Sequence, residues 1–264
     1  MWMEGDLPRD FLIVAINCTD IAMLDGDATE DDIRAMCERA KDPGEGLRPA
    51  AGVCVLPDMV EVAAEALKDS PVRTVVATAG FPDGTLNVIR RQPEAKKALR
   101  LGADEIDTVL NWRALRDGNE AQAFEEIFAI KKWMRDKKLK VIIETGALET
   151  TELIKKATEV AILAGADFVK SSTGAVEPGV TEEAARAMCE VVAEHHGNTG
   201  KMVGVKFSGG INSPDEAVDF MSTVIGTLGF AFLSPHTFRL GSSRLFDATL
   251  EALAADAEAS PDPA

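Results

Sequence analysis

Short runs rich in β-branched and aromatic residues recur along this chain of 264 residues, and a segment with helical periodicity follows each run. Seven of these runs have the length of buried strands: residues 52–56, 74–78, 106–110, 141–144, 168–170, 203–205 and 230–233. An apolar stretch at residues 12–17, ahead of a helix that opens near Thr29, supplies a first strand and brings the count to eight. Eight consecutive strand–helix units predict an α/β fold that closes into a single (β/α)₈ TIM barrel.

An open, doubly wound sheet would use the same strand–helix units. Such a sheet usually carries a G-x-G-x-x-G turn after its first strand, but no such turn follows residues 12–17. Helix-start signals mark strand-to-helix loops at residues 58–61 and 213–216, the second combining a capping box with a proline at the first helical position. The barrel is therefore the favoured architecture.

The composition limits the class of protein and its partners. With 46% hydrophobic and 27% charged residues, the chain is expected to form one globular domain over residues 1–264, with a flexible tail at roughly 254–264. The formal net charge of −16 repels phosphates, so neither nucleic acid nor an anionic membrane is an expected partner. The apolar residues 11–16 are too few for a signal segment or a membrane span. An anionic small-molecule substrate would need a local positive site.

The cysteines and histidines give no metal-binding pattern. The four cysteines are scattered without a C-x-x-C pair, which argues against a zinc site or a disulfide framework: Cys18, Cys37, Cys54 and Cys189. The only histidines are His195, His196 and His236. We therefore expect a cytoplasmic protein with reduced thiols that needs no metal and no other cofactor.

Two lysines follow neighbouring predicted strands. Lys170 ends the apolar run 166–169, and Lys206 ends the next strand in the same context, so both side chains are expected side by side in the barrel mouth. Burial and a neighbouring cation both favour the neutral amine, the form that attacks a carbonyl. Either lysine alone is better interpreted as a strand-end residue that reaches water. Together they predict a nucleophile, Lys170, and its electrostatic activator, Lys206.

Acidic residues at strand positions are candidates for proton transfer. Alternation along residues 102–111 turns Ile106 toward the helices and Asp107 into the barrel, where a lysine is its expected partner. Asp107 is a candidate for moving protons between a bound water and the carbon adjacent to an imine, with a structural ion pair as the alternative. Asp20 and Glu144, near the ends of other strands, are weaker candidates for orienting a lysine or a substrate hydroxyl.

Several loop residues are candidates for lining the site or holding an anion. Cys54 ends a strand, where it either lines the site or serves as a small apolar residue. Glycine-containing loops after the later strands suit phosphate, because backbone N–H groups and a helix N-terminus bind it at close approach. The residues in these loops are Thr173, Gly174, Gly209, Gly210, Gly241, Ser242 and Ser243.

Six motifs occur in an order that resembles the deoxyribose-phosphate aldolase family. They lie at residues 53–57, 79–84, 102–111, 141–146, 165–170 and 205–211, and the resemblance spans roughly residues 20–243. It implies a metal-free class I aldolase that cleaves 2-deoxy-D-ribose 5-phosphate to acetaldehyde and D-glyceraldehyde 3-phosphate through a lysine imine. It also implies that Lys170 is the Schiff-base lysine, that Lys206 activates it, and that Asp107 serves the proton relay. Gly174, Gly209, Gly210, Gly241 and Ser243 resemble the family's phosphate-contacting loops.

The chain departs from the family pattern at the phosphate loops. Ala175 stands where many members carry a lysine, and Asn212 stands where they carry an arginine. Each lost cation removes a charge-assisted contact worth about 1.5–3 kcal/mol, with His236, Arg239 and Arg244 as nearby candidates to compensate. The chain contains no tyrosine, so it lacks the C-terminal tyrosine that some members fold over the site, and the loop 232–237 is a candidate to line a pocket for a different aldehyde.

Three functions therefore stay open. The leading hypothesis is a deoxyribose-phosphate aldolase, and the alternative is an imine aldolase of the same fold that acts on a non-phosphorylated or different aldehyde. A non-catalytic barrel that binds a sugar phosphate is disfavoured, because a binding protein does not need an activated amine. Barrels of this type are often dimers, so a homo-oligomer is expected.

Overall fold

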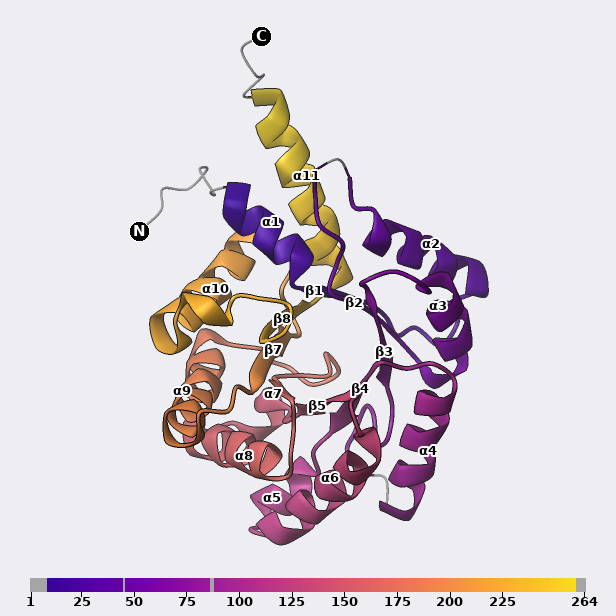
Figure 1. Cartoon of the computed structure of the whole chain (residues 1–264). Helices are drawn as coiled ribbons and strands as arrows, with labels where there is room; N and C mark the ends of the chain where they lie inside the picture. The colour runs from indigo at the N-terminus through magenta and orange to yellow at the C-terminus, as the bar shows by residue number, and fades with distance from the viewer. Residues whose placement is uncertain (1–8, 45, 86–87, 260–264) are drawn as a thin grey trace.

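The eight strands form one closed parallel barrel (Figure 1). The computed structural model describes residues 9–44, 46–85 and 88–259. Each strand pairs with the next in sequence, and β8 closes the barrel on β1 through the register Thr19↔Leu240. The strands are β1 (Thr19–Met23), β2 (Gly52–Val55), β3 (Arg73–Ala77), β4 (Glu105–Val109), β5 (Lys138–Ile142), β6 (Phe168–Lys170), β7 (Gly204–Ser208) and β8 (Phe238–Gly241). The predicted (β/α)₈ barrel is confirmed.

Helices surround the barrel; α1 precedes the first strand, α11 follows the last, and the others lie between strands in sequence (Figure 1). They are α1 (Arg9–Asn17), α2 (Glu30–Lys41), α3 (Val60–Ala66), α4 (Val88–Arg100), α5 (Trp112–Arg116), α6 (Glu120–Met134), α7 (Thr145–Leu148), α8 (Thr151–Leu163), α9 (Glu182–Thr199), α10 (Pro214–Leu228) and α11 (Ser243–Ala259), with 3-10 turns η1 (Pro57–Met59) and η2 (Phe230–Phe232). The predicted tail at 254–264 is thus helical as far as Ala259, and residues 260–264 lie outside the described part. Within the described residues, no helix has both the length and the apolar character needed to cross a membrane.

Side-chain caps start several of these helices. Thr29 forms a capping box with Asp32 at α2, and Ser213 forms one with Glu216 at α10, where Pro214 occupies the first helical position. Each box satisfies backbone N–H groups that the first helical turn leaves without partners. The helix start expected at residues 58–61 is also present, but its first turn is η1 and α3 follows without a side-chain cap.

The first strand lies later than predicted. Residues 12–17 belong to α1, and β1 begins only at Thr19. Leu12, Ala15 and Ile16 recur at helical spacing and are all buried on one side of α1, so the run is an amphipathic helix and not a strand. The true strand contains Thr19 and Asp20, polar residues that a search for apolar runs passes over.

The eighth strand is also displaced. Residues 230–233 were predicted as a strand, but Phe230–Phe232 form the 3-10 turn η2 and Phe230 is 68% exposed. Gly229 ends α10 at a φ of 90° and turns the chain ahead of this segment. The strand β8 follows at Phe238–Gly241, so the loop 232–237 comes before it and lies at the amino-terminal end of the barrel, not at the end where the functional loops were expected.

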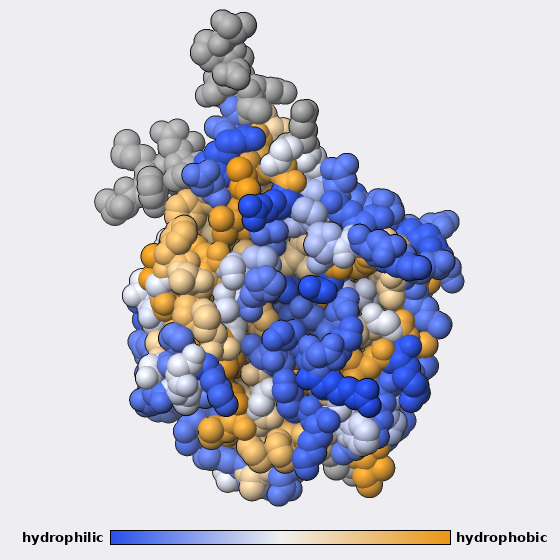
Figure 2. Space-filling model, in the orientation of Figure 1, coloured by the Kyte–Doolittle hydropathy of each residue, from blue (hydrophilic) through white to orange (hydrophobic). Residues whose placement is uncertain are grey.

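Side chains alternate along the strands between two environments. Those turned outward are apolar and pack against the helices, as Ile106, Val141 and Val169 do in the largest core cluster. In the view of Figure 2, hydrophilic residues cover the centre of the molecule's face and hydrophobic ones lie in small groups toward its edge. The inside of the barrel is unusual, because bulky branched apolar residues generally fill that space. Here seven buried charged residues form an interior ion cluster: Asp20, Glu105, Asp107, Lys140, Lys170, Lys206 and Arg239.

Candidate active site

The two lysines predicted from the sequence lie side by side inside the barrel. Lys170 is the last residue of β6, and Lys206 is its register partner on β7. Their side chains are buried, with 3% and 1% exposure of the whole residues. The pairing follows from the parallel register, which places residues at equivalent strand depths next to each other.

Asp107 joins the two amines. Its Oδ2 atom lies 3.0 Å from Nζ of Lys170 and 2.9 Å from Nζ of Lys206. Burial raises the pKa of Asp107, but the ammonium groups of Lys140, Lys206 and Lys170 outweigh burial and hold this pKa well below its ordinary value. Asp107 is therefore an ionised acceptor between two potential donors.

Asp20 completes the environment of Lys206. Its Oδ2 atom lies 2.6 Å from Nζ of Lys206, and its Oδ1 atom accepts a hydrogen bond from Arg239. Burial lowers the pKa of Lys206, yet the carboxylates of Asp107 and Asp20 outweigh burial and raise this pKa above its ordinary value. Lys206 is thus a fixed ammonium. Asp20 lies at the second position of β1, and in the described part of the chain its ion pairs are with Lys206, Lys140 and Arg239, not with Lys170.

Three members of the interior ion cluster were not predicted to lie there: Glu105, Lys140 and Arg239. Lys140 Nζ lies 3.0 Å from Oδ1 of Asp107 and also pairs with Asp20 and Glu105. Arg239 binds Glu105 through Nη2 at 3.0 Å. Alternation would have found Lys140 and Glu105, because each lies two residues from an inward position on its own strand. Arg239 was weighed for phosphate but is held inside the barrel by carboxylates.

The charge balance of the cluster singles out Lys170. If every member is ionised, four cations face three carboxylates, and an uncompensated buried charge is costly. An arginine side chain does not lose its proton in proteins, so Arg239 stays charged. Among the described residues Lys140 contacts three carboxylates and Lys206 contacts two, whereas Lys170 contacts one oxygen that it shares with Lys206. Lys170 is therefore the cation of the cluster with the fewest carboxylate contacts.

Cys54 lies on β2 near this cluster. Burial, together with the Asp107 carboxylate, raises the pKa of its thiol to about 11. A thiol of this kind stays protonated at neutral pH and is a weak nucleophile. Both predictions for Cys54 stay open. It lies close enough to the cluster to line a site, and it also packs as a small apolar residue against Val75 and Ala77.

Glu144 organises the loop that follows Lys170. Its carboxylate accepts hydrogen bonds from the Ser172 hydroxyl at 2.9 Å and from the Thr173 hydroxyl at 2.6 Å. Serine residues also tie this loop to the end of β7, where Ser171 Oγ donates to the carbonyl oxygen of Ser208. The weak expectation that Glu144 orients a lysine is not met, because its partners are the hydroxyl groups and the backbone N–H of Thr173.

The hydroxyl groups in the candidate anion loops already have protein partners. Thr173 donates to Glu144, and the Ser242 hydroxyl accepts from the N–H of Leu245 at the start of α11. Ser243 donates to the carbonyl oxygen of Ala22 and accepts from its N–H, which ties α11 to β1. The hydroxyl protons of Thr173 and Ser243 are therefore already donated, whereas Ser242 keeps its own proton for an anion beside the backbone N–H groups.

The glycines of these loops differ in the room around them. Gly174, Gly209 and Gly210 all have positive φ angles near 88°, which favour glycine. A Cβ atom at Gly209 would lie 2.9 Å from Gly179 Cα and from Ser172 Oγ, so this glycine permits two loops to pack together. Gly210 has open space around it. Gly241, the last residue of β8, lies close to Lys206, since a Cβ there would meet its Cε at 3.1 Å.

Two of the residues considered for compensating the missing cations lie at the wrong end of the barrel. His236 precedes β8, and Arg239 lies within it, so neither reaches the loops after β6 and β7. Only Arg244, exposed in the first turn of α11, stays on the side of those loops. In the described part of the chain, histidine, cysteine and acidic side chains form no cluster of three suited to a metal ion.

The fold is thus a closed parallel barrel with a buried lysine at the carboxyl-terminal end of β6, next to a fixed ammonium on the adjacent strand β7. The chain belongs to the DeoC/LacD family of aldolases, whose sequence profile matches residues 13–231.

Solved structures of aldolases resemble this chain over most of their length. The aldolase QR15 is 28% identical, with a TM-score of 0.77, over 93% of this chain and 99% of its own. A proposed deoxyribose-phosphate aldolase from Coccidioides immitis is 30% identical, with a TM-score of 0.76, over 90% and 86%. Another, from Toxoplasma gondii ME49 in its apo form, is 26% identical, with a TM-score of 0.83, over 94% and 98%.

Proposed function

We propose that this protein is a class I aldolase that cleaves 2-deoxy-D-ribose 5-phosphate to acetaldehyde and D-glyceraldehyde 3-phosphate. The observation that carries the proposal is the arrangement of Lys170 and Lys206 around one carboxylate oxygen of Asp107. This arrangement places one amine, with a single shared carboxylate contact, beside a second that two carboxylates hold as an ammonium. A carbonyl compound is the substrate class that such an amine attacks.

The reaction uses each member of this group in turn. The neutral amine of Lys170 attacks the C1 aldehyde and water leaves, which forms an imine. The imine withdraws the C2–C3 bonding electrons as that bond breaks, the C3 hydroxyl loses its proton, and glyceraldehyde 3-phosphate departs. The remaining enamine takes a proton at C2, and water then releases acetaldehyde and restores the lysine. Asp107, acting through a water molecule, takes up the proton of the C3 hydroxyl and delivers the proton to C2. Lys206 stabilises the negative charge of Asp107.

A retro-aldol assay tests the proposal and the nature of the acceptor together. We expect the enzyme to release acetaldehyde from 2-deoxyribose 5-phosphate, measured by reduction with a coupled dehydrogenase. Unphosphorylated 2-deoxyribose is the matched comparison. Absence of acetaldehyde from both sugars would contradict the proposed reaction, and equal kcat/KM for the two would favour an imine aldolase of the same fold that does not select phosphate.

The second candidate, an aldolase for a non-phosphorylated aldehyde, is favoured by Ala175 and Asn212. Both are exposed, in the loops after β6 and β7. We expect that Ala175→Lys with Asn212→Arg lowers KM for the phosphorylated sugar by about tenfold or more, since one charge-assisted contact is worth about 1.5–3 kcal/mol. KM for the unphosphorylated sugar is the control and should stay unchanged. If the double substitution changes KM equally for both sugars, the phosphate does not bind at the loops after β6 and β7.

A further inference from the structure

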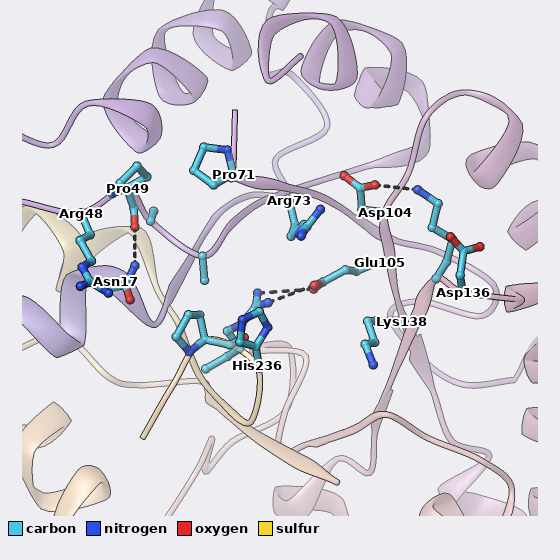
Figure 3. Close-up of a pocket in the computed structure, with 15 residues that line it drawn as sticks. Asn17, Arg48, Pro49, Pro71, Arg73, Asp104, Glu105, Asp136, Lys138 and His236 are labelled. Carbon is cyan, nitrogen blue, oxygen red and sulfur yellow. Dashed lines mark hydrogen bonds and ion pairs between the residues drawn. The ribbon is translucent and has the colours of Figure 1, made fainter. Parts of the chain in front are cut away.

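A cavity opens at the end of the barrel opposite Lys170 and Lys206. It has a volume of about 530 Å³ and is lined from the starts of strands, including Arg73, Glu105 and Lys138, the first residues of β3, β4 and β5. Figure 3 shows these side chains around the cavity, with His236 from the loop before β8. Cavities of roughly 300–1,000 Å³ are the size that holds small ligands.

The charges in this cavity are mostly positive, in a chain whose formal net charge is −16. Arg48, Arg73, Lys137, Lys138 and Arg239 face the carboxylates of Asp104, Glu105 and Asp136. Two of these carboxylates are neutralised locally, because Lys137 Nζ lies 2.7 Å from Asp104 and Arg239 lies 3.0 Å from Glu105. Lys138 pairs with Asp167 outside the cavity.

The remaining guanidinium groups are available to a ligand. Within residues 9–44, 46–85 and 88–259, neither Arg48 nor Arg73 has a carboxylate within 4.0 Å, and both side chains are exposed. Asp136 is the one lining carboxylate in those ranges that lacks a cation. The two exposed guanidinium groups at the rim are free to pair with the oxygens of an anion, whereas the buried Arg239 already binds Asp20, Glu105 and the carbonyl oxygen of Pro235.

The cavity does not communicate with the catalytic lysines. Arg239 closes its floor by binding Asp20 and Glu105, and Lys140 lies between Glu105 and Asp107 on the way to Lys170. A ligand here is consequently separate from the substrate. It would contact the starts of several strands at once.

We propose that this cavity binds a small anion bearing one or more phosphate groups, held by Arg48 and Arg73. Phosphate is the favoured chemistry because guanidinium groups bind its oxygens in pairs. The long-range field of the chain repels anions, so binding depends on these local contacts.

Calorimetric titration with pyrophosphate at fixed ionic strength tests the proposal. We expect Arg48→Ala and Arg73→Ala each to weaken binding at this cavity by about tenfold or more, since each removes a hydrogen bond to a charged group. Arg186→Ala, on the outer surface of α9, removes the same charge elsewhere and is the matched control. A thermal unfolding scan verifies that each variant is folded.

The titration distinguishes this cavity from an anion site at the catalytic mouth. If both sites exist, the wild type binds two equivalents and Arg48→Ala/Arg73→Ala retains one. If the proposed function is wrong and the catalytic mouth binds no anion, the wild type binds one equivalent, which the double variant loses. If the double variant binds pyrophosphate as the wild type does, or if Arg186→Ala weakens binding to the same extent, the proposal is wrong.

Discussion

Borohydride added to the enzyme with 2-deoxyribose 5-phosphate is expected to leave a reduced adduct on Lys170 and none on Lys206. Lys170 contacts a single carboxylate oxygen, shared with its neighbour, whereas Lys206 is held as an ammonium by both Asp107 and Asp20. Only a neutral amine forms an imine. Mass spectrometry of the digested protein identifies the modified peptide, and Lys170→Ala or Lys170→Arg should abolish the adduct and lower kcat by at least about 10³-fold, as loss of a covalent nucleophile does.

Lys206→Met separates the roles of the two lysines. It removes the fixed cation beside Lys170 and leaves Asp107 with one fewer positive partner, so protonation of Lys170 becomes less costly. Trapping on Lys170 should then persist at alkaline pH and decline near neutrality. An adduct on Lys206 in the wild type would reverse these roles, and an active enzyme without an adduct on either lysine would exclude the imine mechanism.

Replacing Lys140 by methionine is expected to lower the free energy of unfolding by about 3–5 kcal/mol, since three buried carboxylates each lose an ion-pair partner. Lys140 lies among the carboxylates of Asp20, Glu105 and Asp107 and is fully buried. Urea unfolding at neutral pH measures the change. Lys138→Met is the matched control, because that lysine lies on the same strand but is exposed and should cost less than about 1 kcal/mol.

The sign of the pH dependence follows from the pKa of Lys140. Burial lowers this pKa, but the carboxylates of Asp107, Glu105 and Asp20 outweigh burial and raise it above 10.5. The stabilisation by Lys140 is therefore complete at neutral pH and is lost only as the pH rises past that value. Equal urea midpoints for Lys140→Met and the wild type at neutral pH would contradict a stabilising role of the ion pairs that Lys140 forms with the three carboxylates.

The amino-acid sequence by itself determined the barrel and the pairing of its two reactive lysines. Strand–helix repetition sets the number of units, and a closed parallel barrel brings strand ends to one face. Lys170 and Lys206 each follow a short apolar run in consecutive strand–helix units, so their proximity was expected from local sequence, although Lys206 is the third of five residues in β7 and not its end. The capping boxes at Thr29 and Ser213 were likewise readable, because all their partners lie within one helical turn.

Only the tertiary structure decided where the barrel begins and ends and what fills it. Residues 12–17 have an apolar pattern compatible with a strand, and packing on one side makes them a helix. Strand alternation turns Lys140 and Glu105 inward, but register across the barrel brings Arg239 to Asp20 and Glu105, residues separated by 219 and 134 positions. These long-range ion pairs depend on the closure of β8 against β1, which no local pattern specifies.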